Sequence, residues 1–377
     1  MSRLLSDYPP DRITVIAGSH ENSQALVQGK LRCKHLIFPT SNETGRWGLG
    51  RAKTLIDWIL IPALILIALW TVYRTNTKVI VTIADGHFFI AAAVVSLISG
   101  IPFILILHDD WVASTESRSY FLCHFARPLF KVVAHSARHI YAVSPPMQEM
   151  LQREFGVESE LQMPAGEPWG HEEECGYEES KMRSAETLRI LYAGTGSTTM
   201  EDSLDLLVEA ISTEHTIRKN TEWELHLYTP TSEEHTRRKG WDHSRIRTHG
   251  WVDQEELKRA IAEADVLFLP FSFREDERYA TERAFPSKTS DYLASGKPIL
   301  VLAPPYSSIV RYAREFECAE IVDRPDPVAL TEAINKLAAS ENYRAQLSRN
   351  SRRAFLLNHD MTQQRASFTR LISSLAH

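Results

Sequence analysis

The strongest constraint on the fold is an alternation of short apolar runs with longer helical stretches along the chain. The runs lie at 13–17, 36–38, 79–83, 103–107 and 140–143, and again at 189–193, 224–228, 246–248, 266–269, 299–302 and 320–322. Runs of this kind, separated by helices, are typical of strands buried in a parallel sheet. The sequence therefore predicts an α/β fold built from two Rossmann-like halves.

Length and charge support two domains and exclude one class of partner. The chain has 377 residues, which is more than one hydrophobic core usually supports. An acidic, polar stretch without apolar periodicity separates the two halves. We place a first domain at 1–168, a linker at 169–187 and a second domain at 188–355. With 42 basic and 48 acidic residues, giving a net charge of −6, nothing indicates a nucleic-acid partner.

One segment, FPSKTSDYLASGKPILV at 285–301, combines a helix start, two charges, a helix stop and a strand. Pro286 suits the first helical position and Gly296 suits the left-handed residue that ends a helix, so the helix is about three turns long. Lys288 adds a charge to the partly positive N-terminus, and Asp291 follows on the same face. A diphosphate at the lysine would bring its ribose to the carboxylate. The residues alone fit this clamp and an ordinary amphipathic helix equally.

A glycine-rich loop and a polar strand end are further candidate sites. The run LRILYAGTGS places Gly194, Gly196 and Ser197 after a strand and before a helix, where a phosphate can approach the backbone closely. In the first domain, LILHDDW puts His108 and Asp109 at the carboxyl end of a buried strand. Open α/β sheets bind their ligands at such ends.

The 285–301 segment resembles the donor-site motif of glycosyltransferase family 4, in which a Pro-x-Lys loop leads into a helix with an acidic residue, followed by Tyr-Leu-Ala-x-Gly-x-Pro and a strand. The matching positions are Pro286, Lys288, Asp291, Tyr292, Leu293, Ala294, Gly296 and Pro298. The resemblance implies that Asp291 holds the nucleotide ribose, and that Ser287 and Lys288 hold the diphosphate. It also implies the GT-B architecture, with two Rossmann-like domains facing a cleft and a helix near 360–377 returning to the first domain.

Two other segments are similar to the same family. In HGWVDQEELKRAIAEADVLFLP the resemblance implies that Trp251 and Val252 contact the nucleotide base, whereas Asp253 reads as the cap of the next helix. It also implies that His108 reaches the donor sugar or phosphate, with Asp109 supporting its orientation. A loop histidine with a purely structural role is the alternative at His108.

The chain departs from the family pattern around the phosphates. The position of the family's second glutamate is Ala284, and the residues at 197–202 lack the Arg and Lys that often follow the glycine loop. Lys288 must then carry most of the phosphate charge, unless a basic residue of the loop that holds Arg274, Arg278 and Arg283 contributes.

A second departure concerns the first domain. Family members begin with a strand and a glycine-rich loop, whereas this sequence starts within the helix that leads to the strand at 13–17. We therefore expect the first domain to lack its first strand, which is central in a doubly wound sheet, and its two neighbours to face a gap.

A long apolar segment raises the question of a membrane. Between residues 55 and 73 only Asp57 and Thr71 are polar, and the unbroken apolar run has thirteen residues with Pro62 inside it. A span needs about twenty apolar residues. We expect a buried domain helix, with one face available to lie on a membrane surface, in preference to a true span.

The cysteines indicate a reducing compartment and no metal site. Cys33, Cys123, Cys175 and Cys318 are scattered without a CxxC pair, which is typical of reduced thiols in the cytosol. We expect no metal and a cytoplasmic location, with the inner membrane face as a peripheral site.

These observations favour a retaining glycosyltransferase that moves a sugar from a nucleotide diphosphate donor to a hydroxyl of a glycan or lipid-linked acceptor, with no cofactor. Retention is implied by the family resemblance. A catalytically silent relative that binds a nucleotide or a partner is the second hypothesis, which Ala284 and the missing cations favour. A sugar-nucleotide epimerase on the same architecture is a third, but it would need an acid/base pair that the sequence does not identify.

Overall fold

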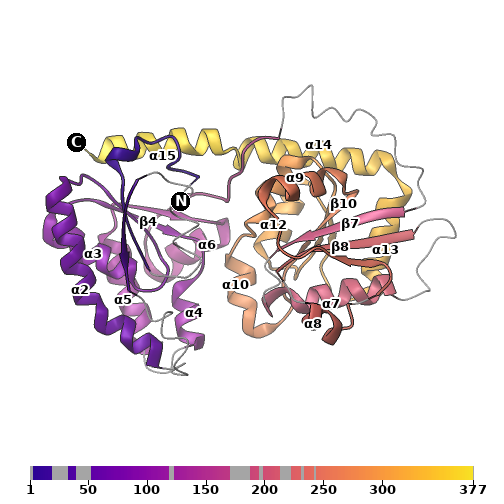
Figure 1. Cartoon of the computed structure of the whole chain (residues 1–377), viewed down its shortest axis with the longest axis horizontal. Helices are drawn as coiled ribbons and strands as arrows, with labels where there is room; N and C mark the ends of the chain where they lie inside the picture. The colour runs from indigo at the N-terminus through magenta and orange to yellow at the C-terminus, as the bar shows by residue number, and fades with distance from the viewer. Residues whose placement is uncertain are drawn as a thin grey trace. The chain divides into compact units, whose positions relative to one another are not determined.

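The computed structural model describes residues 3–18, 33–39, 52–118, 123–169, 187–194, 198–212, 222–230, 233–241 and 243–376 (Figure 1). The chain divides into two compact units. The first unit comprises Met1–Gln162 and Met361–His377, and the second comprises Met163–Asp360. Residues 163–168, which the sequence assigned to the first domain, therefore lie in the second unit.

The second unit contains a six-stranded parallel sheet in the order β12-β11-β10-β7-β8-β9. The strands are β7 (Thr187–Ala193), β8 (Glu222–Tyr228), β9 (Ile246–Thr248), β10 (Val266–Pro270), β11 (Ile299–Leu302) and β12 (Glu320–Val322). All six predicted strands of this half are confirmed. The first three strands run outward from β7 and the last three outward from β10, which is the order of a Rossmann fold.

Helices on the two faces of this sheet supply the rest of the core. They are α7 (Thr198–Ser212), α8 (Glu233–Arg238), α9 (Gln254–Glu263), η5 (Glu275–Glu277), α10 (Arg278–Arg283), α11 (Lys288–Ser295), α12 (Ser308–Phe316), α13 (Pro327–Ala339) and α14 (Glu341–Asn358). Strands β10 and β11 are buried along their whole length, as their unbroken apolar sequences predict.

Side-chain caps fix the starts of several of these helices. The carboxylate of Asp253 accepts from Glu256 N at 2.8 Å, which confirms its predicted capping role at α9. Ser307 Oγ accepts from Val310 N at 3.3 Å at the start of α12, also as predicted. Each cap satisfies a backbone N–H that the helix cannot pair itself.

The first unit has two parallel sheets. One joins β1 (Thr14–Gly18) to β2 (Lys34–Phe38), and the other has the order β3-β4-β5-β6. The remaining elements are β3 (Ile80–Ile83), β4 (Phe103–Leu107), β5 (His139–Ala142), β6 (Glu160–Leu161), η1 (Pro10–Arg12), α2 (Ala52–Thr75), α3 (Phe88–Ser99), α4 (Trp111–Arg118), α5 (Cys123–Ser136), α6 (Pro145–Met150), the π-helical turn η3 (Leu151–Phe155) and α15 (Met361–Leu375). The five strands predicted for this half are all present.

No ladder joins β1 to β3 among the described residues. This separation agrees with the expected gap between the neighbours of a central strand. Helices link the two sheets instead, since Leu64 of α2 and Ala91 of α3 pack with Phe38 of β2, and α3 also contacts β3 and β4. Figure 1 shows α2 and α3 side by side in this unit.

The C-terminal helix completes the core of the four-stranded sheet. Phe368 and Ile372 of α15 pack against Ile104, Ile106 and Tyr141. The last helix therefore belongs to the unit that contains the first strands, although nearly the whole second unit separates them in sequence.

The long apolar helix α2 is not buried as a whole. Its stretch Trp58–Thr75 has a mean hydropathy of 1.7, but only 22% of it is buried. Leu64 is 1% exposed, whereas Leu66 on the opposite face is 67% exposed. The expected burial is therefore confirmed for one face of the helix only, and no element among the described residues covers the other face.

The two faces of α2 predict different costs for the same truncation. Leu64→Ala should lower the free energy of unfolding by about 2–5 kcal/mol, because it leaves a cavity against Phe38 and Ala91. Leu66→Ala should change it by less than about 0.5 kcal/mol. Urea unfolding of the two variants measures both values, and similar losses would contradict the orientation of the helix.

Candidate functional site

The loops after β7 and β10 mark the point where the strand order of the second sheet reverses. Strands β7 and β10 are neighbours, and the strands that follow each of them lie toward opposite edges of the sheet. Ligands of open α/β sheets bind at the carboxyl ends of strands at such a point. Gly194 follows β7 directly and donates its N–H to the carbonyl of Tyr228 at 3.0 Å. Gly196 and Ser197, predicted for the same loop, lie outside the described residues.

Helix α11 begins later than the sequence predicted. Ser287 is its N-cap, in a right-handed conformation with no side-chain hydrogen bond of the capping type, and Lys288 is its first residue. Pro286 lies in the preceding turn, because its carbonyl accepts from Thr289 N at 3.0 Å. The helix has eight residues, about two turns rather than three. Gly296 ends it at φ 66°, as predicted.

A buried tyrosine joins α11 to the glycine loop. Ala193 N, at the end of β7, donates to the Oη of Tyr292 at 2.9 Å, and the Tyr292 side chain is fully buried. Burial raises the pKa of this phenol, so it stays neutral. The structure thus brings together two elements that the sequence proposed separately as phosphate contacts.

Lys288 is an uncommitted cation at the start of α11. The residue is half-buried, and its side chain forms no hydrogen bond or ion pair with any residue that the structure describes. At the other end of the helix, burial lowers the pKa of Lys297, with Asp265 partly opposing this effect. Of these two lysines, Lys288 is the one whose charge adds to the N-terminal end of the helix dipole.

Two of the three arginines that the sequence offered as helpers form pairs within their own loop. Arg274 Nε donates to Asp276 at 3.0 Å, and Arg278 Nη1 donates to Glu275 at 3.2 Å. The Arg278 guanidinium also lies over the Tyr306 ring, 4.4 Å from its centroid. These contacts favour Lys288 over Arg274 and Arg278 as the main phosphate cation.

The acids after the glycine loop have structural roles that sequence reasoning missed. Asp202 Oδ2 accepts from Ser272 Oγ and from Phe273 N, each at 2.9 Å, which fixes the loop after β10. Glu201 pairs with Lys239 at 3.1 Å and with His235 at 3.2 Å. Both acids therefore hold neighbouring segments of the second unit together, in the stretch 197–202 that lacks the expected cations.

Asp291, the predicted ribose contact, lies against a segment far away in the sequence. A Cβ on Gly166 would come within 3.2 Å of Asp291 Oδ1 and 3.6 Å of Ser290 Cβ. Gly166 itself donates its N–H to the carbonyl of His359 at 3.0 Å. No local sequence signal relates these positions, because the contact depends on how the chain enters and leaves the second unit.

His359 is buried where the chain leaves the second unit, against the segment at Pro164 where the chain enters it. Its Nδ1 lies 2.6 Å from the Pro164 carbonyl, which assigns the proton to Nδ1, and its Nε2 then accepts from Tyr312 Oη at 3.0 Å. The ring stacks on Phe285, at the start of the clamp segment. Burial lowers the pKa of His359 to about 4, so the imidazole is neutral at pH 7.

The predicted base contacts lie on a turn that is supported by stacked rings. Trp251 is 77% exposed and Val252 is half-buried, directly after Gly250 at φ 69°. Beneath them the His249 ring stacks on Tyr228 with centroids 4.3 Å apart. The exposed indole is free to contact a planar ligand by stacking.

In the first unit, His108 and Asp109 directly follow β4, as the sequence predicted, and both are exposed. Neighbouring chain atoms still remove enough water to lower the pKa of His108, with Asp85 opposing the shift. Asp110 is buried and caps α4 by accepting from Ala113 N at 2.9 Å. The role of His108 in catalysis stays a prediction.

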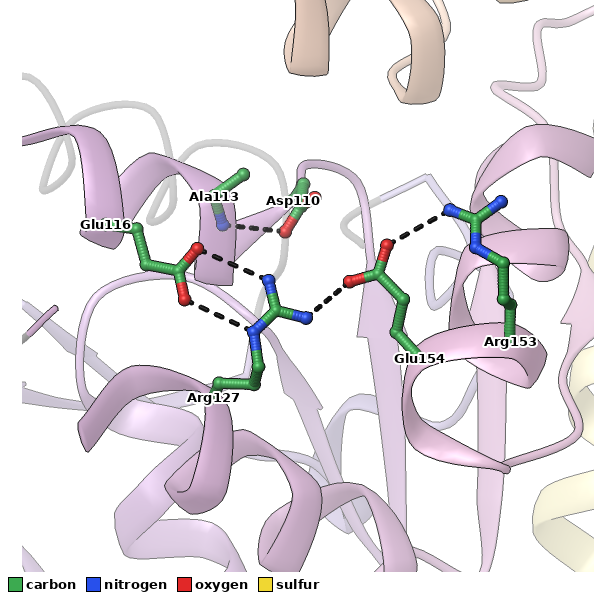
Figure 2. Close-up of polar contacts among 6 residues, drawn as sticks. All are labelled: Asp110, Ala113, Glu116, Arg127, Arg153 and Glu154. Carbon is green, nitrogen blue, oxygen red and sulfur yellow. Dashed lines mark hydrogen bonds and ion pairs between the residues drawn. The ribbon is translucent and has the colours of Figure 1, made fainter. Parts of the chain in front are cut away.

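An ion-pair network fixes the helix that follows His108 (Figure 2). Arg127 of α5 contacts Glu116 of α4 through two bonds of 3.4 Å, and contacts Glu154 of η3 at 2.6 Å. Glu154 also accepts from Arg153 at 3.1 Å. Because Arg127 is half exposed, solvent screens these ion pairs and they add little to stability. Their main effect is to orient α4.

Among the residues that the structure describes, no group of three or more His, Cys, Asp or Glu side chains is arranged to hold a metal ion.

Comparison with known proteins connects this geometry to a family. Residues 187–340 match the family described as "Glycosyl transferases group 1". This matched region contains the glycine loop, the stacked turn and α11. The match indicates a glycosyltransferase.

Solved structures share the fold over almost the whole chain. HepE of Anabaena, in complex with UDP and glucose, has a TM-score of 0.68 at 13% identity, covering 99% of this chain and 94% of that one. A glycosyltransferase of Rickettsia africae has a TM-score of 0.68 at 11% identity, covering 96% and 90%. Sucrose-phosphate synthase of Thermosynechococcus elongatus gives 0.62 at 14%, covering 84% and 78%. No curated protein sequence matches the chain.

These structures confirm the predicted GT-B fold of this glycosyltransferase. Its two α/β units with parallel sheets correspond to the two Rossmann-like halves expected from the alternation of strands and helices.

The buried histidine predicts a pH dependence of stability for this glycosyltransferase. The folded pKa of about 4 lies below the unfolded value of about 6.5, so the unfolded chain takes up the proton first as the pH falls. The stabilisation is complete above about pH 6.5 and is lost progressively down to about pH 4, by about 3 kcal/mol in total. The urea midpoint should therefore fall more steeply from about pH 7 to pH 5 in the parent than in His359→Gln.

The His359→Gln variant retains every other titrating group, so the difference between the two slopes isolates His359. Parallel pH profiles would show that the imidazole is not held neutral by burial.

Proposed function

We propose that this glycosyltransferase transfers a sugar, with retention, from a nucleotide diphosphate donor to a hydroxyl of a glycan or lipid-linked acceptor. The observation that carries the proposal is the hydrogen bond from Ala193 N to Tyr292 Oη, which holds α11 against the end of β7, next to Gly194. HepE, which shares the fold, was solved with UDP-glucose as well as with UDP, so a UDP-sugar is the first donor class to test.

The proposed chemistry is stabilisation of the leaving group. The bond between the anomeric carbon and the diphosphate oxygen breaks, and negative charge grows on that oxygen. Lys288 and the backbone N–H groups at the start of α11 supply positive charge there, and the Gly194 loop supplies a close backbone approach. The acceptor hydroxyl forms the new bond on the same face of the sugar and loses its proton to the departing diphosphate oxygen. Asp291 accepts from the ribose hydroxyls.

Substitution of Lys288 tests the donor site. Lys288→Ala should weaken UDP binding about tenfold to a hundredfold, because a charge-assisted contact contributes about 1.5–3 kcal/mol. Lys297→Ala, at the opposite end of the same helix, should leave the affinity within about threefold. Calorimetric titration of the full chain with UDP, GDP and ADP measures these affinities, and equal Kd values for the two variants would refute the assignment.

Substitution of His108 tests a separate part of the proposal. His108→Ala should lower kcat about a hundredfold while leaving the UDP affinity nearly unchanged, because the nucleotide-binding elements all belong to the second unit and His108 to the first. Initial rates of UDP release from UDP-glucose, measured with and without acceptor, provide kcat. A variant with the turnover of the parent would make His108 a structural loop residue.

A catalytically silent nucleotide-binding protein is the second candidate function. Glu201 and Asp202, which are engaged in structural contacts where the family often has phosphate-binding cations, favour it. Tight UDP binding together with no sugar release from any UDP-sugar would support this candidate over transfer.

A further inference from the structure

The outward face of α2 is apolar where a soluble helix would be polar. Its exposed large side chains form one stripe along the helix, which we call the α2 stripe: Ile59, Leu66, Ile67, Trp70 and Tyr73. Pro62 and Ala63 are exposed on the same face. The spacing of these positions is close to the 3.6-residue period, so they stay on one side of the helix. From Ile59 to Tyr73 the stripe is about 21 Å long.

This concentration distinguishes the α2 stripe from scattered surface hydrophobics. Five of the thirteen exposed large hydrophobic side chains among the described residues lie on this single helix. Single exposed apolar residues are ordinary on soluble proteins, whereas a continuous stripe marks a contact surface.

The polar groups of α2 are arranged for an apolar environment. Thr71 Oγ1 donates to the Ile67 carbonyl and Thr75 Oγ1 to the Thr71 carbonyl, each at 2.8 Å, so both hydroxyls are satisfied within the helix. No ionisable side chain occurs between Trp58 and Tyr73. Apart from the phenol of Tyr73 at its end, the stripe therefore offers no charge or unpaired hydroxyl that contact with lipid would desolvate.

One end of the stripe has the chemistry of a membrane interface. Trp70 and Tyr73 are exposed beside Arg74 and Lys78, which are exposed as well. The Arg74 guanidinium lies 5.0 Å from the centroid of the Trp70 ring. Aromatic rings with a polar edge occupy the headgroup level, and adjacent cations attract anionic lipids.

The inward face of α2 determines how the helix can meet a bilayer. Leu64 packs with Phe38 of β2 and Ala91 of α3, and Ile61, Thr71 and Val72 are also buried. A helix that crossed the membrane would expose these partners, whereas a helix that lies in the interface keeps them packed. Figure 1 shows α2 at the margin of the first unit.

We propose that the α2 stripe is a membrane-docking surface, which lies in the plane of an anionic bilayer with its apolar side chains in the interface and with Arg74 and Lys78 at the phosphate groups. The proposal concerns binding alone and does not depend on the donor site or on transfer activity.

Vesicle flotation of the full chain tests the proposal with a matched pair of variants. Leu66→Glu places a charge in the stripe, and Val328→Glu places one at a side chain of almost equal exposure, 67% against 66%, on α13 of the second unit. The parent and Val328→Glu should float with vesicles of phosphatidylcholine and phosphatidylglycerol. The affinity of Leu66→Glu for these vesicles should be lower by a factor of about ten or more. Equal binding of the two variants, or no binding by the parent, would overturn the proposal.

The basic residues and the aromatic residues at this end of the stripe are tested by separate measurements. Replacing both Arg74 and Lys78 by Gln should reduce binding to vesicles with phosphatidylglycerol but leave binding to phosphatidylcholine alone unchanged. On addition of vesicles, the tryptophan emission of the parent should shift to shorter wavelength, and this shift should be smaller in Trp70→Phe. The same shift in both proteins would place Trp70 outside the bilayer.

Two further outcomes assign the stripe to another occupant and overturn the proposal. Light scattering that shows a concentration-dependent dimer, which Leu66→Glu dissociates, would assign it to a second copy of the chain. Resistance of the vesicle-bound protein to alkaline extraction would assign it to a membrane-spanning helix. Extraction at high pH and a monomer in solution support docking in the interface.

Discussion

The hydrogen bond between Ala193 and Tyr292 is the constraint on which the candidate site depends. It connects the last residue of a central strand to the middle of α11, two positions that are 99 residues apart in sequence. Without the phenol, the Ala193 N–H would be buried and unpaired, at a cost of about 1–3 kcal/mol. The bond thus fixes where α11 lies relative to the end of β7 and to Gly194, which follows it. For the proposed donor site, this contact would reduce the cost of ordering α11 when a ligand binds.

Local signals explain why so much of the second unit could be predicted. Buried strands in a parallel sheet are written as continuous apolar runs, a left-handed glycine ends a helix, and a short polar side chain starts one. Gly296, Asp253 and Ser307 each act within four residues of their own position, so their roles can be read from the sequence. The start of α11 was misplaced because a proline suits both the first helical position and the turn before it.

Contacts between distant residues account for what the sequence could not reveal. Asp202 reads as an acid where a cation is expected, and only its bond to Ser272, 70 residues away, shows that it fixes the loop after β10. Lys288 could be proposed from its position in the sequence. That its side chain has no partner among the described residues, whereas Arg274 and Arg278 are paired, can be seen only in the structure. In α2, apolar residues surround the helix, so no periodicity could tell which face the domain covers.

The contact between Gly166 and Asp291 has a consequence for how sequence variation in this protein should be interpreted. Gly166 lies outside the clamp segment, and its backbone N–H is used by His359. Any side chain at this position would press on the carboxylate of Asp291, since even a Cβ atom would come within 3.2 Å of it. In a mutational scan, substitutions at Gly166 would then resemble a loss of the Asp291 carboxylate, the proposed ribose contact. Gly166 would then be classed as a ligand-binding residue, although it has no side chain to bind with. What the site requires at this position is the space that a glycine leaves beside Asp291.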